Sequence, residues 1–374
     1  MGAPGGERSS RGERPPPARA ALLSGLRRHL FASPSSALAT LLVGGGLLAL
    51  LPRAVHWLFT GAVYRADYDA CRALAYSAAC WGFVAEKHRL ILFGRYPYAE
   101  QWRPLVATLL VLLTLFVSAH PRAWRRGLLL LWALVLIAFL LFMGGGAAGL
   151  SRVEPAEWGG FPLTVILTVV GVAASIPLGI VLALGRRSRL PLARGACTLY
   201  IELVRGVPLI TVLFVASFVF PLLMPGGLKL DVLTRITLGI TLFQAAYMAE
   251  VIRGGLQALP RGQFEAAAAL GLSSWQTQAK VILPQALVLV IPSLVNSLLS
   301  TFMDTSLVTV VSLYDLTGSL RLALGDPRWR NFFLEGYLFV GALYFVCCLA
   351  MSRYSQWLER RLGRWIRRPE ARPA

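Results

Sequence analysis

One carboxylate stands in a long apolar stretch, where a charge is costly. Residues 301–311 are apolar or hydroxylic apart from Asp304. An ionisable group in an apolar segment of membrane-spanning length marks a functional position by default. Such a carboxylate can hold an ammonium group, with Thr305, Ser306 and Asn296 as neutral hydrogen-bond partners. Alternatively, helix N-termini or a partner subunit satisfy Asp304.

Two acid–base pairs share one spacing. Glu202 precedes Arg205 by three residues, as Glu250 precedes Arg253. Residues three apart lie on one face of a helix, so each pair can form an ion pair. For Glu202 and Arg205 we expect either a gate or loop-anchoring role or a plain structural ion pair. Glu250 and Arg253 either brace the following polar loop or form a surface pair.

The elements that must position these groups are membrane helices. Hydrophobic residues make up 56% of the 374-residue chain, and its mean hydropathy is +0.62. Several apolar runs approach the roughly 20 residues that cross a bilayer as a helix. Backbone polar groups in hydrocarbon must be satisfied internally, which favours helices. The sequence therefore predicts an all-α integral membrane protein and excludes a soluble one.

Hydropathy predicts eight spans. They cover residues 38–58, 103–120, 127–146, 161–184, 200–223, 235–252, 286–311 and 332–352. Most of the arginines and lysines fall on one side if the N-terminus is inside, as the positive-inside rule requires. An even number of spans returns the chain to its starting side. We therefore expect both termini, and the polar loop between the sixth and seventh spans, to be cytoplasmic.

The polar loop, residues 263–284, is built to form helices outside the bilayer. Its alanine-rich start predicts a short helix from Phe264 to Leu270. Gly271 can end this helix with a positive φ, and Ser273 or Ser274 can cap a second one. We expect two short helices at an angle to each other.

This loop resembles the EAA loop of the permease subunits of bacterial binding-protein-dependent ABC importers, with Val281 replacing the usual Ile. The matching positions are Glu265, Ala266, Ala267, Gly271, Leu283 and Pro284. The resemblance implies that the first short helix sits in a groove of a separate ABC ATPase subunit. Without this spacing, an amphipathic surface helix linking two spans would be the plain interpretation.

Four stretches between Pro155 and the C-terminal part extend the resemblance to the polar amino-acid permease family. They are residues 158–164 (WGGFPLT), 200–209 (YIELVRGVPL), 246–255 continuing into the loop, and Asp304 to Val308 preceded by Asn296. One departure is Met303, where the family commonly has a Lys before the Asp. This leaves the charge preference for substrate open.

The resemblance implies import of L-amino acids across the bacterial inner membrane by a permease that is not itself an enzyme. ATP and Mg²⁺ would bind the partner ATPase, since this chain has no GxxxxGK[ST] loop and needs no cofactor of its own. Two permease subunits would face each other, and a periplasmic amino-acid-binding protein would deliver substrate. Three additional N-terminal spans resemble the larger general L-amino-acid permeases, which work as heterodimers.

The expected layout has four parts. Residues 1–37 form a disordered basic N-terminus, and residues 38–154 contain three spans with a periplasmic loop at 60–101. Residues 155–352 form the five-helix permease core with its cytoplasmic coupling helices, and residues 353–374 form a basic tail. Recognition of the delivery protein by the 60–101 loop is a hypothesis that rests on its length and its aromatic residues.

The net charge of +19 does not indicate a nucleic-acid-binding protein, because the arginines flank spans and form no basic module with interleaved aromatics. Anionic membrane lipids are the expected partners. The five cysteines and four histidines show no metal-ligand spacing. Cys71 and Cys80 share the expected periplasmic loop, where they form a disulfide or pack within small amphipathic helices.

Two other classes of membrane protein would show different sequence features. An ion-gradient-driven secondary transporter would use its own intramembrane ionisable relay and often internal repeats. A membrane-embedded enzyme would expose clustered His, Asp or Glu at one interface. The sequence shows few intramembrane ionisable residues, no clear duplication and no such cluster. The importer permease is therefore the preferred interpretation, with the secondary transporter as the alternative.

Overall fold

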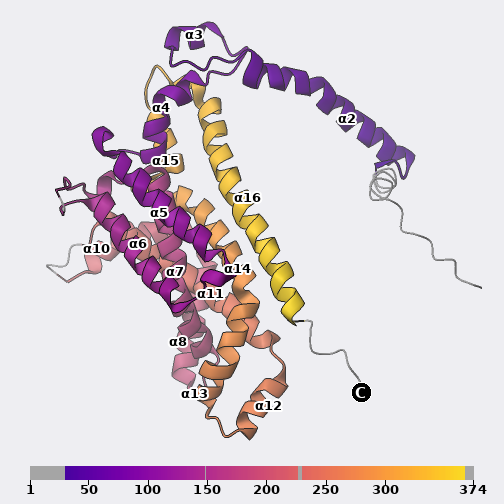
Figure 1. Ribbon diagram of the computed structural model, residues 1–374, viewed down its shortest axis with the longest axis vertical. Coiled ribbons are helices and arrows are strands. Elements are labelled where there is room, and N and C mark those ends of the chain that lie inside the picture. Colours follow the sequence, from indigo (N-terminus) through magenta and orange to yellow (C-terminus); the bar gives the residue numbers. More distant parts are fainter. Residues whose placement is uncertain (1–29, 148, 226–229, 367–374) are drawn as a thin grey trace, which may run out of the picture. The chain divides into compact units, whose positions relative to one another are not determined.

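The computed structural model describes residues 30–147, 149–225 and 230–366, and these residues are mainly helical (Figure 1). Its helices are α2 (Pro34–Val55), α3 (Tyr68–Ala73), α4 (Gly82–Phe93), α5 (Trp102–Ser118), α6 (Arg126–Gly144), α7 (Gly160–Arg186), α8 (Pro191–Gly206), α9 (Leu209–Phe214), α10 (Phe220–Leu223), α11 (Val232–Ala258), α12 (Arg261–Ala269), α13 (Ser274–Gln276), α14 (Leu283–Asp304), α15 (Leu316–Leu324) and α16 (Phe333–Ile366). The π-helical segments are η1 (His56–Thr60), η5 (Val215–Val219) and η6 (Thr277–Ile282). The 3₁₀ segments are η2 (Tyr98–Glu100), η3 (Pro121–Ala123), η4 (Pro155–Glu157), η7 (Thr305–Val311) and η8 (Arg330–Phe332), and Tyr314–Asp315 forms the short strand β1.

The described part of the chain contains seven helical segments long and apolar enough to cross a membrane, or eight if one bent pair is counted as a span. This agrees with the prediction of an all-α membrane protein with about eight spans. The bent pair consists of the segments Pro191–Gly206 and Leu209–Leu223, which meet at 106°. The predicted span over residues 200–223 is therefore bent, as a broken span or a re-entrant loop, and is not one continuous helix.

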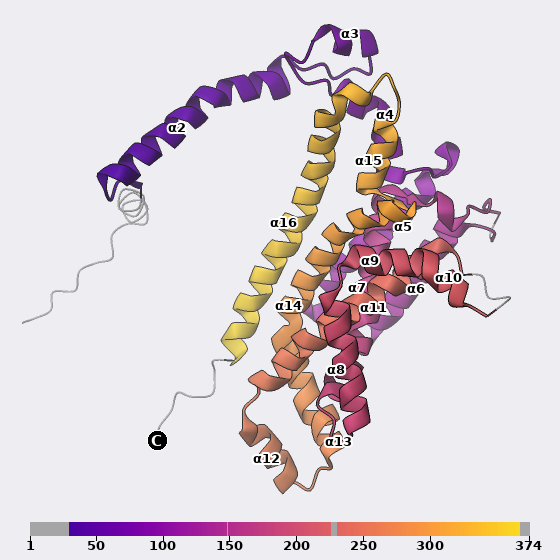
Figure 2. The same ribbon diagram turned by 180° about the vertical axis from the view of Figure 1, so that it is seen from behind.

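The break between α8 and α9 has a local cause. Proline disfavours the helical conformation of the residue before it, and Val207 is accordingly extended, at φ −108° and ψ 138°, ahead of Pro208. Figure 2 shows α9 running across the direction of α8 after this break. As a result, Glu202 and Arg205 lie near the C-terminal end of α8 rather than at the start of a span.

The structure bears on both ends of the predicted layout. Helix α2 already begins at Pro34, where Ser33 and Ser36 form a capping box, so residues 34–37 are helical rather than disordered. Helix α16 continues to Ile366, beyond the predicted span end at 352. The hydropathy signal marks where the apolar residues end, not where the helix ends. Residues 1–29 and 367–374 of the predicted termini lie outside the described residues.

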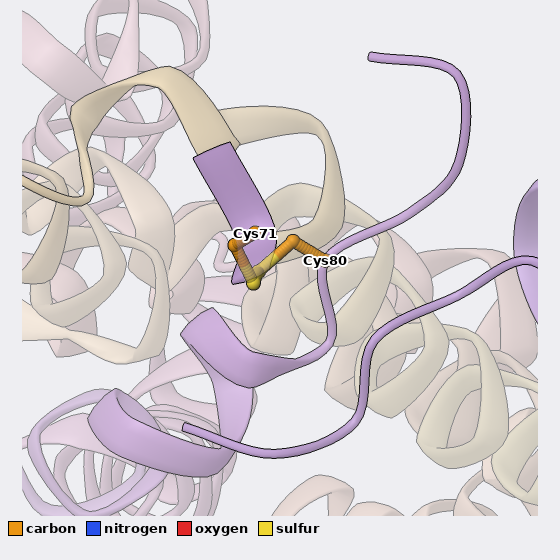
Figure 3. The surroundings of a disulfide bond; sticks show 2 residues. All are labelled: Cys71 and Cys80. Atoms are coloured by element: carbon orange, nitrogen blue, oxygen red, sulfur yellow. A yellow bond between two sulfur atoms is a disulfide. The ribbon is translucent and has the colours of Figure 1, made fainter. Parts of the chain in front are cut away.

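Among the described residues, one compact unit comprises 30–64 and 69–80. Helix α2 buries none of its residues within this unit. A disulfide joins Cys71 to Cys80, with their Cα atoms 5.4 Å apart, and this decides between the two alternatives considered for these cysteines (Figure 3). The bond closes a short loop that runs from Cys71, within α3, to Cys80.

The second unit contains the remaining helices, and its core is the close contact of α7 with α11. Small residues recur every four positions on the buried face of α7, at Gly171, Ser175, Gly179 and Ala183. A Cβ atom at Gly179 would lie 2.5 Å from the Cβ of Met248 on α11. Small side chains let membrane helices approach closely, so that packing contacts replace the hydrophobic driving force that lipid does not supply.

The backbone at the start of α7 pairs with β1, the short strand that follows η7. Gly160 has φ +65°, and a Cβ atom there would lie 2.1 Å from the Leu92 carbonyl oxygen, so the turn into α7 needs a glycine. Asp315 is fully buried and caps α15 by accepting hydrogen bonds from the backbone of Gly318 and Thr317. Burial raises the pKa of the Asp315 carboxyl above its usual range.

Candidate functional site

The coupling segment, defined as residues 261–284, begins with α12. The glycine predicted to end this helix does so: Gly271 has φ +72°. Its N–H donates to the Ala268 carbonyl, and the Leu272 N–H donates to the Ala267 carbonyl. This is the Schellman arrangement, which satisfies the carbonyl groups left free at a helix end. The chain therefore leaves α12 in a fixed direction.

Helix α12 presents one face to solvent and buries the other. Ala267 is 3% exposed, and Phe264 packs against a hydrophobic cluster that includes Ile282. Glu265 and Ala266 are exposed. The segment also exposes two large apolar side chains, Leu270 at 80% and Trp275 at 70%. The segment thus carries apolar surface that the packed helices of this chain do not cover.

The second predicted helix is present, but it is not a separate element. Ser273 caps α13 in a capping box with Gln276, which selects Ser273 over Ser274 as the cap. Helix α13 then continues through η6 into α14, and the whole region 274–311 forms one candidate span. The expectation of two separate short helices is therefore wrong for the second one.

Leu283 and Pro284 lie in the first turn of α14, where η6 joins it. The Leu283 N–H donates to the Gln278 carbonyl, five residues back, as in a π-helical turn. Proline has no N–H to donate and its ring crowds the carbonyl of the preceding turn. The wider π-helical turn lets the helix pass Pro284 without a break.

Charged side chains of α7, α8 and α11 cluster around Glu250 of α11. One carboxylate oxygen of Glu250 lies 2.7 Å from Nη1 of Arg186, and the other lies 2.8 Å from Nη2 of Arg253. Arg253 also donates to Gln257. The predicted pair of Glu250 and Arg253 is thus confirmed. Among the described contacts, these residues join α11 to α7 and α8, and none reaches α12.

The predicted pair of Glu202 and Arg205 is not formed. Glu202 instead lies 2.7 Å from Nη2 of Arg186 at the end of α7. Arg205 approaches Glu250, at 3.9 Å, and its guanidinium lies 5.6 Å from the centre of the Tyr247 ring. Close packing of α7 on α8 brings Arg186 within reach of Glu202, so a tertiary partner replaces the local one.

A cavity of about 620 Å³ lies between the α8–α9 junction, α11 and α14. Its polar lining includes Arg205, Gln244, Tyr247, Asn296, Ser297, Ser300 and Asp304. The residues Asn296, Ser300 and Asp304 are spaced by four, so they form one polar stripe along α14. Within the described residues, Asp304 makes no hydrogen bond or ion pair.

The structure brings together only part of the predicted substrate path. Arg205, Asn296 and Asp304 line the cavity, whereas Thr305, Ser306 and Glu202 do not. Thr305, the first residue of η7, is 1% exposed and its hydroxyl donates to the Phe302 carbonyl of α14. The turn from α14 into η7 separates these hydroxyls from the face that carries Asp304.

Sequence reasoning missed several residues of these sites. Arg186, the shared partner of Glu202 and Glu250, carries no local signal other than its place at the end of a span. Ser300 could have been found, because its four-residue spacing from Asn296 and Asp304 is visible in the sequence. Within the described residues, no group of three or more His, Cys, Asp or Glu side chains could hold a metal ion.

Residues 175–364 match the family model described as "binding-protein-dependent transport system inner membrane component". The matched region contains the charged cluster, the cavity and the coupling segment. The chain belongs to this family. It is therefore a membrane permease component of a transport system and not a catalytic enzyme, and its family implies an ATPase and a binding protein as partners.

The chain is similar to curated proteins over most of its length. It is 45% identical to the inner membrane amino-acid ABC transporter permease protein YhdY of Escherichia coli (strain K12), covering 90% of this chain and 92% of that protein. It is 36% identical to the glutamate/glutamine/aspartate/asparagine transport system permease protein BztC of Rhodobacter capsulatus, covering 91% and 93%. A solved amino acid ABC transporter crystallised with histidines is 29% identical, with a TM-score of 0.49, and covers 54% of this chain and 92% of that one.

Proposed function

We propose that this chain is the permease subunit of an ATP-driven importer of L-amino acids, coupled to its ATPase through the coupling segment. The observation that carries the proposal is α12: a short helix anchored by Phe264 and Ala267, ended by Gly271, with Leu270 and Trp275 exposed beside it. A fixed helix with protruding apolar side chains can transmit a push to the membrane spans. The names of YhdY and BztC support amino acids as the substrate class.

The proposed substrate path is the cavity lined by Arg205, Asn296 and Asp304. Arg205 supplies a cation for a substrate carboxylate, and the half-buried Asp304 supplies an anion for its ammonium group. The hydroxyl and amide groups between them accept or donate hydrogen bonds without charge. The cavity thus offers both charges that the backbone of an amino acid requires.

In this proposal, Glu250, Arg253 and their partner Arg186 hold together the ends of α7, α8 and α11, next to the chain that leads into α12. A displacement of α12 by the ATPase would pass through the backbone connection at residues 259–260 to the end of α11, and from Glu250 on α11 to Arg205. Glu202 stabilises the same arrangement through Arg186.

The remaining parts of the proposed assembly lie on other molecules. ATP and Mg²⁺ bind the ATPase subunits, and this chain needs no cofactor. A second, related permease completes a heterodimer, and a periplasmic amino-acid-binding protein delivers substrate. The chain lies in the bacterial inner membrane with both termini cytoplasmic, in contact with anionic lipids. The basic residues at the ends of the spans support this orientation.

The test is co-purification of the ATPase with the full-length permease from its native membrane in mild detergent. Leu270→Asp places a charge on the exposed apolar surface beside α12 and should abolish recovery of the ATPase. Leu190→Asp is the matched control, because Leu190 is 68% exposed in the connection between α7 and α8. Equal recovery of the ATPase with both variants would overturn the proposed role of α12.

A further inference from the structure

A groove of about 710 Å³ separate from the substrate path lies between the end of α5, η3 and the last turns of α16. Its lining is almost entirely apolar and aromatic, with Phe116 and Val117 from α5 and Tyr354 and Trp357 from α16. Ala119, His120, Arg122 and Ala123 also line it. Nothing in the proposed transport mechanism uses this groove.

Helix α16 divides its residues between two faces in this region. Ser355 and Leu358 are buried, and the Ser355 hydroxyl lies 3.4 Å from the Pro292 carbonyl of α14. Tyr354, Trp357 and Arg361 follow a spacing of three and four residues, which places them on another face. The groove therefore contains the face of α16 that is not used to pack against α14.

The groove combines aromatic rings with positive charge at its rim. The rings of Tyr354 and Trp357 stack with their centres 5.8 Å apart. The guanidinium of Arg361 lies 5.2 Å from the centre of the Trp357 ring. Arg122 lies on the opposite wall and is exposed. The exposed acid Glu359 lies two residues after Trp357 on the same helix and thus on a different side of α16.

An apolar stripe leads away from the groove along α5. Leu109, Leu113 and Phe116 are 54%, 60% and 78% exposed and are spaced by four and three residues. Aromatic residues and basic side chains at the end of a span, followed by such a stripe, match the level of the headgroups and the acyl chains of a bilayer. A lipid phosphate at the rim would pair with the arginines, and the acyl chains of the same lipid would cover the apolar stripe.

We infer that this groove is a binding site for one anionic phospholipid, whose phosphate lies between Arg122 and Arg361 and whose acyl chains follow α5. A free phosphate would leave the apolar walls exposed. In the proposed orientation, the lipid belongs to the cytoplasmic leaflet.

The test uses the full-length protein in neutral detergent, with lipid binding followed by native mass spectrometry. Phosphatidylglycerol should bind the wild type more tightly than phosphatidylcholine does, and glycerol 3-phosphate should not bind. The double variant Arg122→Gln/Arg361→Gln should bind phosphatidylglycerol about thirtyfold more weakly, since each basic residue near the lipid surface contributes roughly a factor of five. The control Arg152→Gln/Arg330→Gln removes two exposed arginines elsewhere and should leave binding unchanged.

A second readout locates the lipid. Brominated phosphatidylglycerol quenches the fluorescence of nearby tryptophans, and the quenched component should disappear in Trp357→Phe but persist in Trp275→Phe. Unchanged affinity in the Arg122/Arg361 double variant would overturn the proposal. Equal quenching of Trp357 by brominated phosphatidylcholine would also overturn it, as would tight binding of glycerol 3-phosphate alone.

Discussion

Arg186 of α7 donates to Glu250 of α11 at 2.7 Å, and its second terminal nitrogen donates to Glu202 of α8, also at 2.7 Å. One guanidinium thus ties two carboxylates on two other helices. Glu250 is the more enclosed of the two, at 16% side-chain exposure against 56% for Glu202. The two acids should therefore differ in their contribution to stability.

Replacing Glu250 by Gln should destabilise the permease by about 2 kcal/mol, because a hydrogen bond to a charged group is worth more than a neutral one and the arginines lose their shared anion. Glu202→Gln is the matched control and should cost less than about 1 kcal/mol, because exposed ion pairs contribute little. Thermal unfolding in detergent measures both. A larger loss for Glu202→Gln would contradict the central place of Glu250.

Alanine substitutions at Gly271 and Gly262 form a second matched pair of variants. A Cβ atom meets nothing within 4 Å at either position, but only Gly271 has a positive φ. Gly271→Ala should destabilise the coupling segment by about 1–2 kcal/mol through backbone strain alone. Gly262→Ala, inside α12, should stabilise it by about 0.5–1 kcal/mol. Hydrogen exchange of the α12 amides reports both changes, and equal effects would refute the capping role of Gly271.

The disulfide predicts a definite count of reactive thiols. Denatured protein that has not been reduced should take up alkylating label at Cys197, Cys347 and Cys348, and reduction should add Cys71 and Cys80. Closing this short loop should stabilise it by about 2.5 kcal/mol. The Cys71→Ser/Cys80→Ser variant should therefore become sensitive to protease between residues 64 and 81. Five labelled cysteines before reduction would contradict the bond.

In the proposed substrate path, amino-acid uptake depends on Asp304 and not on the neighbouring Met303. Asp304→Asn keeps the shape but removes the charge that faces the cavity, and uptake should fall at least tenfold, which corresponds to about 1.4 kcal/mol. Met303→Leu is the control, because Met303 is 53% exposed and does not line the cavity. Radiolabelled amino-acid uptake by cells measures both. Unchanged uptake in Asp304→Asn would remove this residue from the path.

The sequence alone predicts the features that depend on local chemistry. A membrane protein with about eight spans, the cap at Gly271 and the pair of Glu250 with Arg253 follow from hydropathy, backbone conformation and helix spacing. Each depends on residues close together in the chain. The extended conformation of Val207 before Pro208 also follows from the local sequence. The apolar run around these residues nevertheless favoured the prediction of one continuous span.

Features that depend on tertiary contacts could not be predicted in this way. Arg186 reaches Glu202 only because α7 packs closely on α8, where a Cβ atom at Gly185 would lie 2.4 Å from the sulfur of Cys197. The polar stripe that ends at Asp304 faces a cavity formed by three helices that are distant in sequence. Spacing places a side chain on a helix face, but packing decides what that face meets.

The most direct test of the proposed importer is uptake by proteoliposomes that contain this permease with its partner permease, its ATPase and its binding protein. Labelled amino acid should accumulate only when ATP and binding protein are both supplied, and Leu270→Asp should abolish accumulation whereas Leu190→Asp should not. Accumulation driven by an ion gradient with the permease alone would contradict the account and would identify a secondary transporter instead.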